Sequence, residues 1–264
     1  YEPGMDSLVQ GKQLLRADLR KALGRGELSL AFQPLMTFAT GRVGAMEALL
    51  RWTHPQHGPM SPDEFIPLAE ETGVIVPLGA WVLHEACLAA ATWPEEITVS
   101  VNLSPVQFRR HGLVEAVEAS LKASGLEASR LQLEVTETVL MQNVADELEV
   151  LHALRRLGVR IAMDDFGTGY SSLSYLRTFP FDNIKIDRSF IADMSRNAQT
   201  NAIVRAVVEL GQSLGVTTTA EGVENRQQMQ ELRAMGCHAG QGFLFSPPVP
   251  GSEVLALIER LGAE

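Results

Sequence analysis

The most constraining feature of this 264-residue sequence is a repeated alternation of short apolar segments with longer amphipathic ones. The short segments are rich in β-branched residues, which is typical of strands, and the longer ones follow a helical period. Eight strands are expected, at Leu30–Phe38, Val43–Leu50, Ile97–Asn102, Leu131–Val135, Val159–Asp164, Asn183–Ile186, Thr217–Ala220 and, more weakly, near His238. One helix between them has an expected buried stripe of Ile203, Val207, Leu210 and Leu214. This alternation predicts an α/β fold of the TIM (β/α)8 barrel type, and the length suits one such domain.

The first two strand candidates depart from this pattern because the segment between them is too short. Little more than the stretch ATGR, residues 39–42, joins them, whereas a parallel crossover needs a dozen or more residues. We therefore expect an antiparallel hairpin with a turn near Thr40, which would place Gln33 opposite Glu47.

Residues 7–24 have the apolar spacing of an amphipathic helix that precedes the first strand. The chain opens on Tyr1 rather than on methionine, so we expect an excised part of a longer protein. The predicted organisation is a linker helix from a missing upstream domain over residues 1–26, followed by the barrel over residues 27–264.

A polar residue lies at or just past the end of each later strand. These residues are Glu47, Asn102, Glu134, Asp164, Lys185, Glu221 and Gln241. Each has a common structural role when it is taken alone, such as a helix cap for Asn102 or an ion-pair partner for Lys185. The carboxyl ends of barrel strands meet on one face, however, so the whole set is expected to converge there.

Carboxylate and amide oxygens suit hard cations such as Mg²⁺ or Mn²⁺ better than they suit Zn²⁺. The adjacent carboxylates of Asp164 and Asp165 would repel each other in the absence of a cation. Two cations that share one carboxylate as a bridge would remove this repulsion, and such pairs assist in-line displacement at phosphorus. The residues therefore predict a two-metal phosphoesterase.

The formal net charge of −10 argues against a general nucleic-acid binder, so no DNA partner is expected. Cys87 and Cys237 lack the spacing of a disulfide or metal motif, which fits a reducing, cytoplasmic location. No apolar run approaches the roughly 20 residues of a membrane span. This fragment is expected to make no direct membrane contact, although the full-length protein could be tethered to the inner membrane through a segment upstream.

Several stretches, taken in order, resemble one known family over about residues 14–262. They are MEALLRW, SPDEFIPLAEETG, VNLSPVQF, LEVTET, MDDFGTGYSSL, IKIDRSF, AEGVE and QGFLFSPP. The ordered series is similar to the EAL domain family of bacterial cyclic di-GMP phosphodiesterases.

The resemblance implies a modified TIM (β/α)8 barrel with an antiparallel first strand. It also implies hydrolysis of one phosphodiester bond of cyclic di-GMP to linear 5′-pGpG with two Mg²⁺ or Mn²⁺ ions. The implied metal ligands, by position in the motifs, are Glu47, Asn102, Glu134, Asp164, Asp165 and Glu221. Asp164 would bridge the two ions.

The resemblance also implies roles in substrate binding and catalysis. The implied substrate-binding residues are Gln33, Glu47, Leu49, Arg51, Asn102, Asp164 and Gln241. The implied catalytic residues are Glu47, Lys185, Glu221 and Glu137. Lys185 would contact the attacking water, Glu221 would position or deprotonate it, and Glu137 would brace the loop after Asp165. For Phe243, a guanine pocket and an ordinary core position both stay open.

The partners that the resemblance implies are cyclic di-GMP, a second copy of the chain in a homodimer, and an upstream GGDEF or sensor domain. An EAL domain that binds cyclic di-GMP without cleaving it is the main alternative. A barrel of the enolase type would explain the acids and Lys185, but it gives no role to Asn102 or Gln241. A purely structural scaffold would have no reason to collect acids on one rim.

Overall fold

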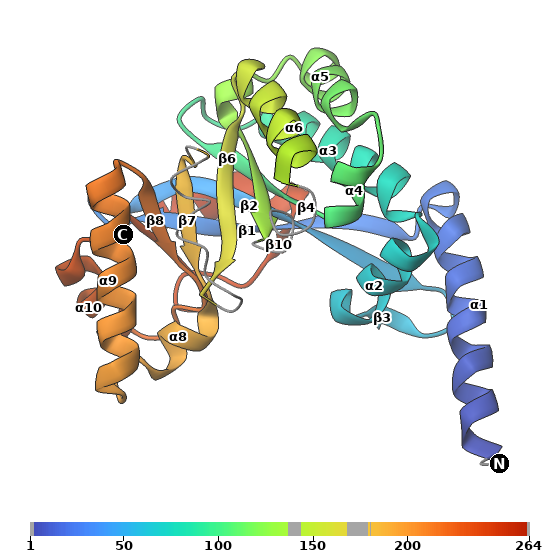
Figure 1. The fold of residues 1–264 in the computed structure, drawn as a ribbon, viewed down its shortest axis with the longest axis horizontal. Helices are drawn as coiled ribbons and strands as arrows, with labels where there is room; N and C mark the ends of the chain where they lie inside the picture. The colour runs from blue at the N-terminus through green and yellow to red at the C-terminus, as the bar shows by residue number, and fades with distance from the viewer. Residues whose placement is uncertain (1–2, 137–143, 168–178, 180, 263–264) are drawn as a thin grey trace.

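A computed structural model describes residues 3–136, 144–167, 179 and 181–262 (Figure 1). Its central feature is a closed barrel of eight strands, which confirms the predicted fold class. In order around the barrel these are β1 (Leu28–Thr37), β9 (Ala239–Gln241), β8 (Thr217–Ala220), β7 (Asn183–Ile186), β6 (Arg160–Phe166), β5 (Leu131–Thr136), β4 (Thr98–Leu103) and β2 (Arg42–His54). Strand β1 is antiparallel to both of its barrel neighbours, and the other adjacent pairs are parallel.

The β1–β2 hairpin has the register expected from the short connection. Gln33 pairs with Glu47, and the neighbouring Pro34 pairs with Met46. Short strands β3 (Gly58–Met60) and β10 (Val249–Pro250) extend the sheet beside β2 and β1. The register matters for function because it places two of the predicted site residues side by side.

Helices surround the barrel, as Figure 1 shows. They are α1 (Pro3–Arg25), α2 (Pro62–Thr72), α3 (Ile75–Ala90), α4 (Pro105–Arg109), α5 (Leu113–Ser124), α6 (Val144–Arg156), α8 (Arg188–Asp193), α9 (Ala198–Leu214), α10 (Arg226–Met235) and α11 (Val254–Gly262). Short 3-10 turns cover Ala128–Arg130 and Gly251–Glu253. Among the described residues, none of these helices combines the length and apolarity that crossing a membrane requires.

The expected apolar stripe of α9 is confirmed at Val207, which is buried, and at Leu210, which packs against the core, but it is wrong at its two ends. Ile203 and Leu214 are each 46% exposed, and the buried residues are Val204, Val207, Val208 and Gly211. The β-branched side chains of Val204 and Val208, four residues apart, pack inward together with Val207. The helix is therefore rotated so that the larger Ile203 and Leu214 lie at the edge of the contact.

The main hydrophobic core lies between the barrel wall and the helices rather than inside the barrel. Alternate residues of each strand point outward into this core, such as Val99 and Val101 of β4 and Leu133 of β5. Several of the residues between them point inward and are polar, such as Gln132 of β5, which donates a hydrogen bond to Ser100 of the neighbouring β4. Most TIM barrels fill this interior with branched apolar side chains, so the polar interior marks this barrel as unusual.

A second, smaller core joins α1 to the barrel. Leu19 and Ala22 of α1 are buried with Leu28, Trp52 and Phe65. Figure 1 shows α1 beside α2 and β3 at one end of the molecule. The division between a linker over residues 1–26 and a barrel from residue 27 stays a prediction.

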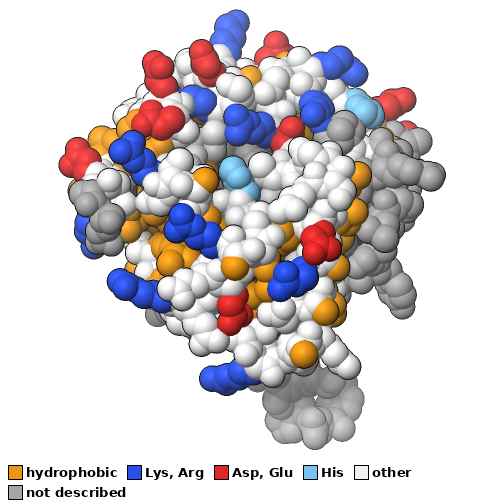
Figure 2. Space-filling view, turned by 90° about the vertical axis from the view of Figure 1, so that its left-hand side faces the viewer, with side chains coloured by type: hydrophobic (Ala, Val, Ile, Leu, Met, Phe, Trp, Pro, Cys, Tyr) orange, Lys and Arg blue, Asp and Glu red, His pale blue; other side chains and the backbone are white. Residues whose placement is uncertain are grey.

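The face in Figure 2 carries intermixed basic and acidic side chains, with small hydrophobic patches between them. Cys87 and Cys237 are both buried free thiols, and burial raises the pKa of Cys87 to about 12. Both cysteines therefore behave as small apolar core residues.

Candidate active site

The predicted site residues converge at the carboxyl ends of the barrel strands. Nine of them line one cavity of about 750 Å³: Gln33, Glu47, Leu49, Arg51, Asn102, Asp164, Asp165, Glu221 and Gln241. Lys185 and Glu134 lie just beneath it and are each 1% exposed. Glu137 lies outside the described residues, as does most of the GTGYSSL loop.

Lys185 is the centre of the cluster. Its Nζ lies 2.5 Å from Glu134 Oε2, 2.6 Å from Glu221 Oε1, 3.4 Å from Asp164 Oδ1 and 3.7 Å from Glu47 Oε2. Burial alone would lower the pKa of this ammonium, but the four carboxylates outweigh burial and raise it well above its usual value. Lys185 is therefore a fixed positive charge at the base of the cavity.

Glu134 is the most deeply buried acid of the cluster. Desolvation raises its pKa well above the usual value, the nearby Glu47 and Asp164 charges add to the rise, and Lys185 opposes it. Its Oε1 atom is buried without a hydrogen-bond partner among the described residues. A buried carboxylate oxygen left unpaired in this way is available to a cation.

Two amide side chains donate to the carboxylate of Glu47, and a third bonds to one of them. Asn102 Nδ2 donates to Glu47 Oε1 and Gln241 Nε2 donates to Glu47 Oε2, both at 2.6 Å. The same Gln241 nitrogen lies 3.0 Å from Gln33 Oε1, and Gln33 donates to the Ser246 carbonyl at 3.1 Å. These bonds orient the Glu47 carboxylate between β1, β4 and β9.

Asp164 and Asp165 reach the same side of the sheet because β6 contains a bulge. Met163 pairs with Ile184 and Phe166 with Ile186, so two β6 residues face the single Lys185 of β7. Asp165 adopts φ 54°, which lies in the left-handed region. In a regular strand, neighbouring side chains would point to opposite faces, so the bulge is what brings the two carboxylates together.

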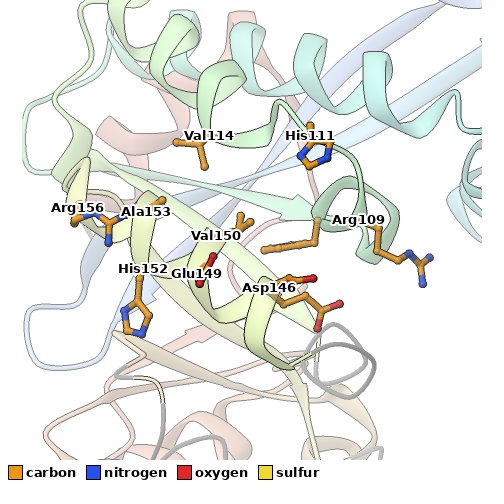
Figure 3. Close-up of a pocket in the computed structure, with 11 residues that line it drawn as sticks. Arg109, His111, Val114, Asp146, Glu149, Val150, His152, Ala153 and Arg156 are labelled. Carbon is orange, nitrogen blue, oxygen red and sulfur yellow. The ribbon is translucent and has the colours of Figure 1, made fainter.

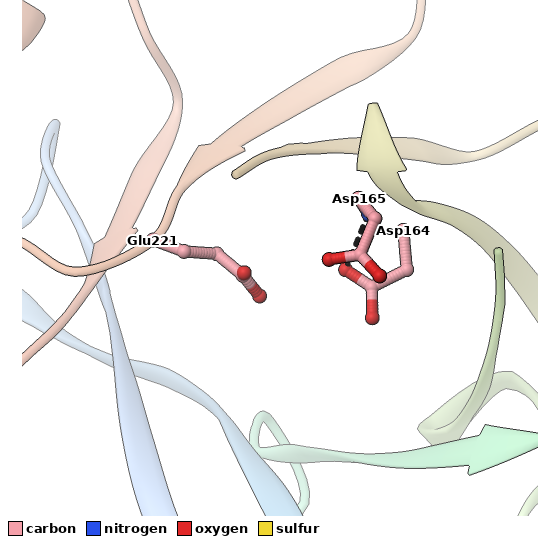
Figure 4. Close-up of side chains that lie close together, drawn as sticks. All are labelled: Asp164, Asp165 and Glu221. Atoms are coloured by element: carbon pink, nitrogen blue, oxygen red, sulfur yellow. Dashed lines mark hydrogen bonds between the residues drawn. The ribbon is translucent and has the colours of Figure 1, made fainter. Parts of the chain in front are cut away.

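Glu221 completes an acidic group with these aspartates. Figure 4 shows it reaching from the end of β8 toward them, and one oxygen of each of the three carboxylates lies within 4.8 Å of the others. Burial, with repulsion from Asp164 and Glu47, raises the pKa of Glu221 to about 7 despite the nearby Lys185. Burial and the charges of Asp164 and Asp187 also raise the pKa of Asp165.

Close backbone packing holds the ends of β8 and β9. A Cβ on Gly242 would lie 2.1 Å from the Val223 carbonyl oxygen, so only glycine fits after Gln241. Val223 and Gln241 are also joined by a backbone hydrogen bond of 2.9 Å. Glu221 and Gln241 are thus carried by two loops in direct contact.

The lining of the cavity also includes positive and apolar groups. Arg51 is half-buried and donates to the Leu50 carbonyl at 3.0 Å, and burial lowers its pKa although Glu47 opposes this. Phe243 lines the cavity and is 71% exposed, so it is not an ordinary core residue.

Sequence reasoning gave no role in the site to several residues that line the cavity. They are Asp63, Arg188, Gly222, Gly242 and Pro248. Asp63 and Arg188 lie in quoted motifs, but they stand a few residues beyond the strand ends. Their proximity depends on how the loops fold back, for which the strand pattern carries no signal.

Asp187 accepts a hydrogen bond from the Ser189 N–H at 3.0 Å and so caps α8.

The residues present fit a pair of hard divalent cations. All donors are carboxylate or amide oxygens, and Gln241 Oε1 joins Glu134 Oε1 as a buried oxygen without a partner among the described residues. The acids also exceed the local positive charge, since five carboxylates accompany one lysine. Desolvation is the main cause of the raised pKa values of Glu134, Asp165 and Glu221, and repulsion from the other acids adds to it.

A larger cavity of about 920 Å³ lies elsewhere, between α4, α5 and α6 (Figure 3). Arg109, His111, His152 and Arg156 line it together with acids of α6. None of the strand-end residues reaches it. The convergence of strand ends, rather than size, therefore identifies the candidate site.

Comparison with known proteins agrees with this geometry. A model of the EAL domain matches residues 16–248, and the chain therefore belongs to the EAL domain family. It is 52% identical over 259 residues to the uncharacterized protein y4lL of Sinorhizobium fredii, covering 98% of this chain and 31% of that protein. It is 44% identical over 262 residues to the bifunctional diguanylate cyclase/cyclic di-GMP phosphodiesterase MucR of Pseudomonas aeruginosa, covering 98% of this chain and 38% of MucR.

Among solved structures, the PaMucR phosphodiesterase in complex with c-di-GMP superposes with a TM-score of 0.88 at 45% identity. The match covers 92% of this chain and 100% of that one. The chain spans about a third of the length of the curated relatives it matches.

Proposed function

We propose that this domain hydrolyses cyclic di-GMP in the presence of two divalent cations, Mg²⁺ or Mn²⁺, and releases linear 5′-pGpG. The observation that carries the proposal is the acidic cluster around Lys185 at the base of an open cavity. Its five carboxylates and one ammonium have a formal charge of −4 when ionised, which two divalent cations would balance. Membership of the EAL domain family and the likeness to PaMucR support this substrate.

The residues divide into two groups of cation ligands. Glu47, Asn102, Glu134 and Asp164 would hold one cation, and Asp164, Asp165 and Glu221 would hold the other. Cations in such a pair lower the pKa of water and stabilise negative charge on a phosphoryl oxygen. The bulge in β6 supports the bridging role of Asp164, because it puts both aspartates at one end of the strand.

The remaining residues would position the substrate and the attacking water. Arg51 offers a guanidinium to a phosphate, and Gln33 and Leu49 line the same cavity beside it. Lys185 would contact the attacking water through its ammonium, and Glu221 would orient the water or accept its proton. A carboxylate whose pKa lies near 7 suits that task at neutral pH. Gln241 would keep Glu47 oriented, and Glu137 is proposed to brace the loop that follows Asp165.

Several broader features remain proposals for the whole protein. We propose that the domain works as a homodimer, that a GGDEF or sensor domain precedes it, and that it acts in the cytoplasm. The curated relatives are about three times as long as this chain, and MucR is a bifunctional diguanylate cyclase/cyclic di-GMP phosphodiesterase, which supports the further domain. The homodimer and the location rest on the resemblance to the family.

The direct test is to incubate the purified domain with cyclic di-GMP and either Mg²⁺ or Mn²⁺ and to separate the nucleotides by chromatography. Linear 5′-pGpG is expected with either ion, and none is expected after chelation. Tight binding of cyclic di-GMP with no linear product would instead indicate a receptor domain.

A further inference from the structure

The strand end that carries Asn102 is tied to α2 by a short chain of hydrogen bonds. Ser104, two residues beyond Asn102, donates from its hydroxyl to Glu70 Oε1 at 2.6 Å. The same hydroxyl accepts a hydrogen bond from the Val106 N–H at 3.1 Å and so caps α4. Glu70 therefore holds the hydroxyl that begins α4 and fixes the turn after Asn102.

Gln107 ties the same turn from its other side. Its Oε1 accepts a hydrogen bond from the Ser104 N–H at 2.9 Å, and its side chain is buried against α3. A Cβ on Gly79 of α3 would lie only 2.1 Å from Gln107 Nε2 and 2.6 Å from its Cδ. Glycine is unfavourable within a helix, so this contact gives a packing reason for Gly79.

Leu103 is buried in the main core, but the packing beside this strand end is not complete. A cavity of about 310 Å³ lies beside it, and Glu70, Gly79, Asn102, Ser104 and Gln107 all line that cavity. Leu49, Arg51 and Asn102 line both this cavity and the cavity of the candidate active site, so the two spaces share a wall. The backbone of Asn102 is held by pairing with Glu134 of β5, and the hydrogen bonds around Ser104 fix the turn that leaves the strand beside this cavity.

We propose that Glu70 is a positioning residue of the active site, which acts through Ser104 to hold Asn102 against Glu47. Asn102 Nδ2 lies 2.6 Å from Glu47 Oε1, so a displaced Asn102 would also release one of the bonds that orient Glu47. A hydrogen bond to a carboxylate is charge-assisted and stronger than a bond between neutral groups. The Glu70 carboxylate can therefore hold the Ser104 hydroxyl more firmly than a neutral acceptor would. The consequence for turnover rests on the proposed function, whereas the consequence for metal binding does not.

The test compares Mn²⁺ binding by calorimetry, without substrate, in the wild type and in Glu70→Ala. We expect Mn²⁺ to bind about 10-fold or more weakly in Glu70→Ala, because partners that orient metal ligands typically contribute 10–100-fold to affinity. Glu70→Gln keeps an accepting oxygen, but its neutral bond is only about half as strong as the charge-assisted one. The Mn²⁺ affinity of this variant should therefore fall, but stay within about threefold of the wild type.

Glu71→Ala is a matched control. It removes the same charge from the next position of the same helix, but Glu71 pairs with Arg16 of α1 and its side chain is 58% exposed. Wild-type Mn²⁺ affinity is expected in this variant. With cyclic di-GMP as substrate, Glu70→Ala should lose turnover at low Mn²⁺ and recover at saturating Mn²⁺, which a general loss of folding would not produce.

Equal Mn²⁺ affinities in Glu70→Ala and Glu71→Ala would overturn the proposal, as would a wild-type chain that binds no Mn²⁺. If Glu70→Ala does not fold, Ser104→Ala removes the donor at the other end of the bond and decides in its place. If the wild type binds Mn²⁺ but leaves cyclic di-GMP intact, the proposed function fails, and the Mn²⁺ affinities still decide the role of Glu70.

Discussion

The two ends of the barrel interior are both polar and buried, but they differ in charge. At the amino-terminal end, Gln132 donates to Ser100 at 3.0 Å and Asn183 donates to Thr219 at 2.9 Å. These four side chains are neutral and bond to one another. Two residues further along β5 and β7, the charged layer around Lys185 has raised carboxyl pKa values and an excess of acids.

The difference teaches that buried polarity alone does not identify a functional site. The amino-terminal layer is compatible with a structural role, since its four side chains are neutral and bond in pairs, although Asn183 Oδ1 is buried without a partner among the described residues. The carboxyl-end layer is costly without a ligand, because several acids share one lysine in a desolvated place. Removal of an acid from the charged layer should therefore lower activity more than stability, whereas removal of a neutral partner from the amino-terminal layer should lower stability more than activity.

Lys185→Met should have the largest effect, because it removes the ammonium group that four carboxylates share. Removing one partner from a buried charge cluster typically costs about 3–5 kcal/mol, and we expect a loss of this size in the metal-free protein. Turnover should be lost as well. Urea unfolding with and without Mn²⁺ measures the effect, and Mn²⁺ should restore part of the stability. An unchanged unfolding midpoint without metal would contradict the electrostatic role of Lys185.

Glu47→Ala and Asp164→Asn should each reduce turnover of cyclic di-GMP by more than ~100-fold, since groups that merely orient metal ligands already contribute 10–100-fold. The fold should survive, because both changes lower the excess of negative charge. Product chromatography and thermal unfolding measure the two quantities. Retained turnover in either variant would show that the ligand assignment is wrong.

Metal affinity should depend on pH through Glu221. Its pKa is raised to about 7, so in the metal-free protein it is protonated below that pH. Binding a cation requires the carboxylate and releases the proton, so affinity should fall by up to about tenfold per pH unit below 7 and level off above it. Calorimetry in buffers of different ionisation enthalpy counts the released proton. In Glu221→Gln the pH dependence should become shallower, and an unchanged slope would assign the proton to another group.

Asn183→Leu, in the neutral layer, should have the smallest effect on activity. It leaves the Thr219 hydroxyl without its donor, which should lower stability by about 1–3 kcal/mol. Turnover at saturating Mn²⁺ should stay close to that of the wild type. A loss of turnover as large as that of Asp164→Asn would erase the distinction between the two layers.

Much of the fold follows from the sequence, because the signals that define it are local. The short connection at Thr40 permits only an antiparallel hairpin, so the pairing of Gln33 with Glu47 could be predicted and is confirmed. The convergence of the strand-end residues followed from barrel geometry. The face of α9 that is buried could not be predicted in full, because Ile203 and Val204 are both apolar and only tertiary packing decides which of them faces the core.

The finer structure of the site could not be predicted from the sequence. The left-handed Asp165 and the bulge around it depend on pairing with β7, which sequence spacing does not reveal. The four carboxylates around Lys185 needed the closed barrel to bring five strands together. The bond from Ser104 to Glu70 joins residues 34 positions apart in the sequence and has no periodic signal.

The central claim is that the charged layer is built for a pair of divalent cations. The most direct measurement is anomalous diffraction from crystals of the domain grown with Mn²⁺. The account predicts two Mn²⁺ peaks at the carboxyl ends of the strands, with the Asp164 carboxylate between them and Glu134 and Glu221 on either side. A domain that cleaves cyclic di-GMP while its crystals show no Mn²⁺ at these residues would contradict it.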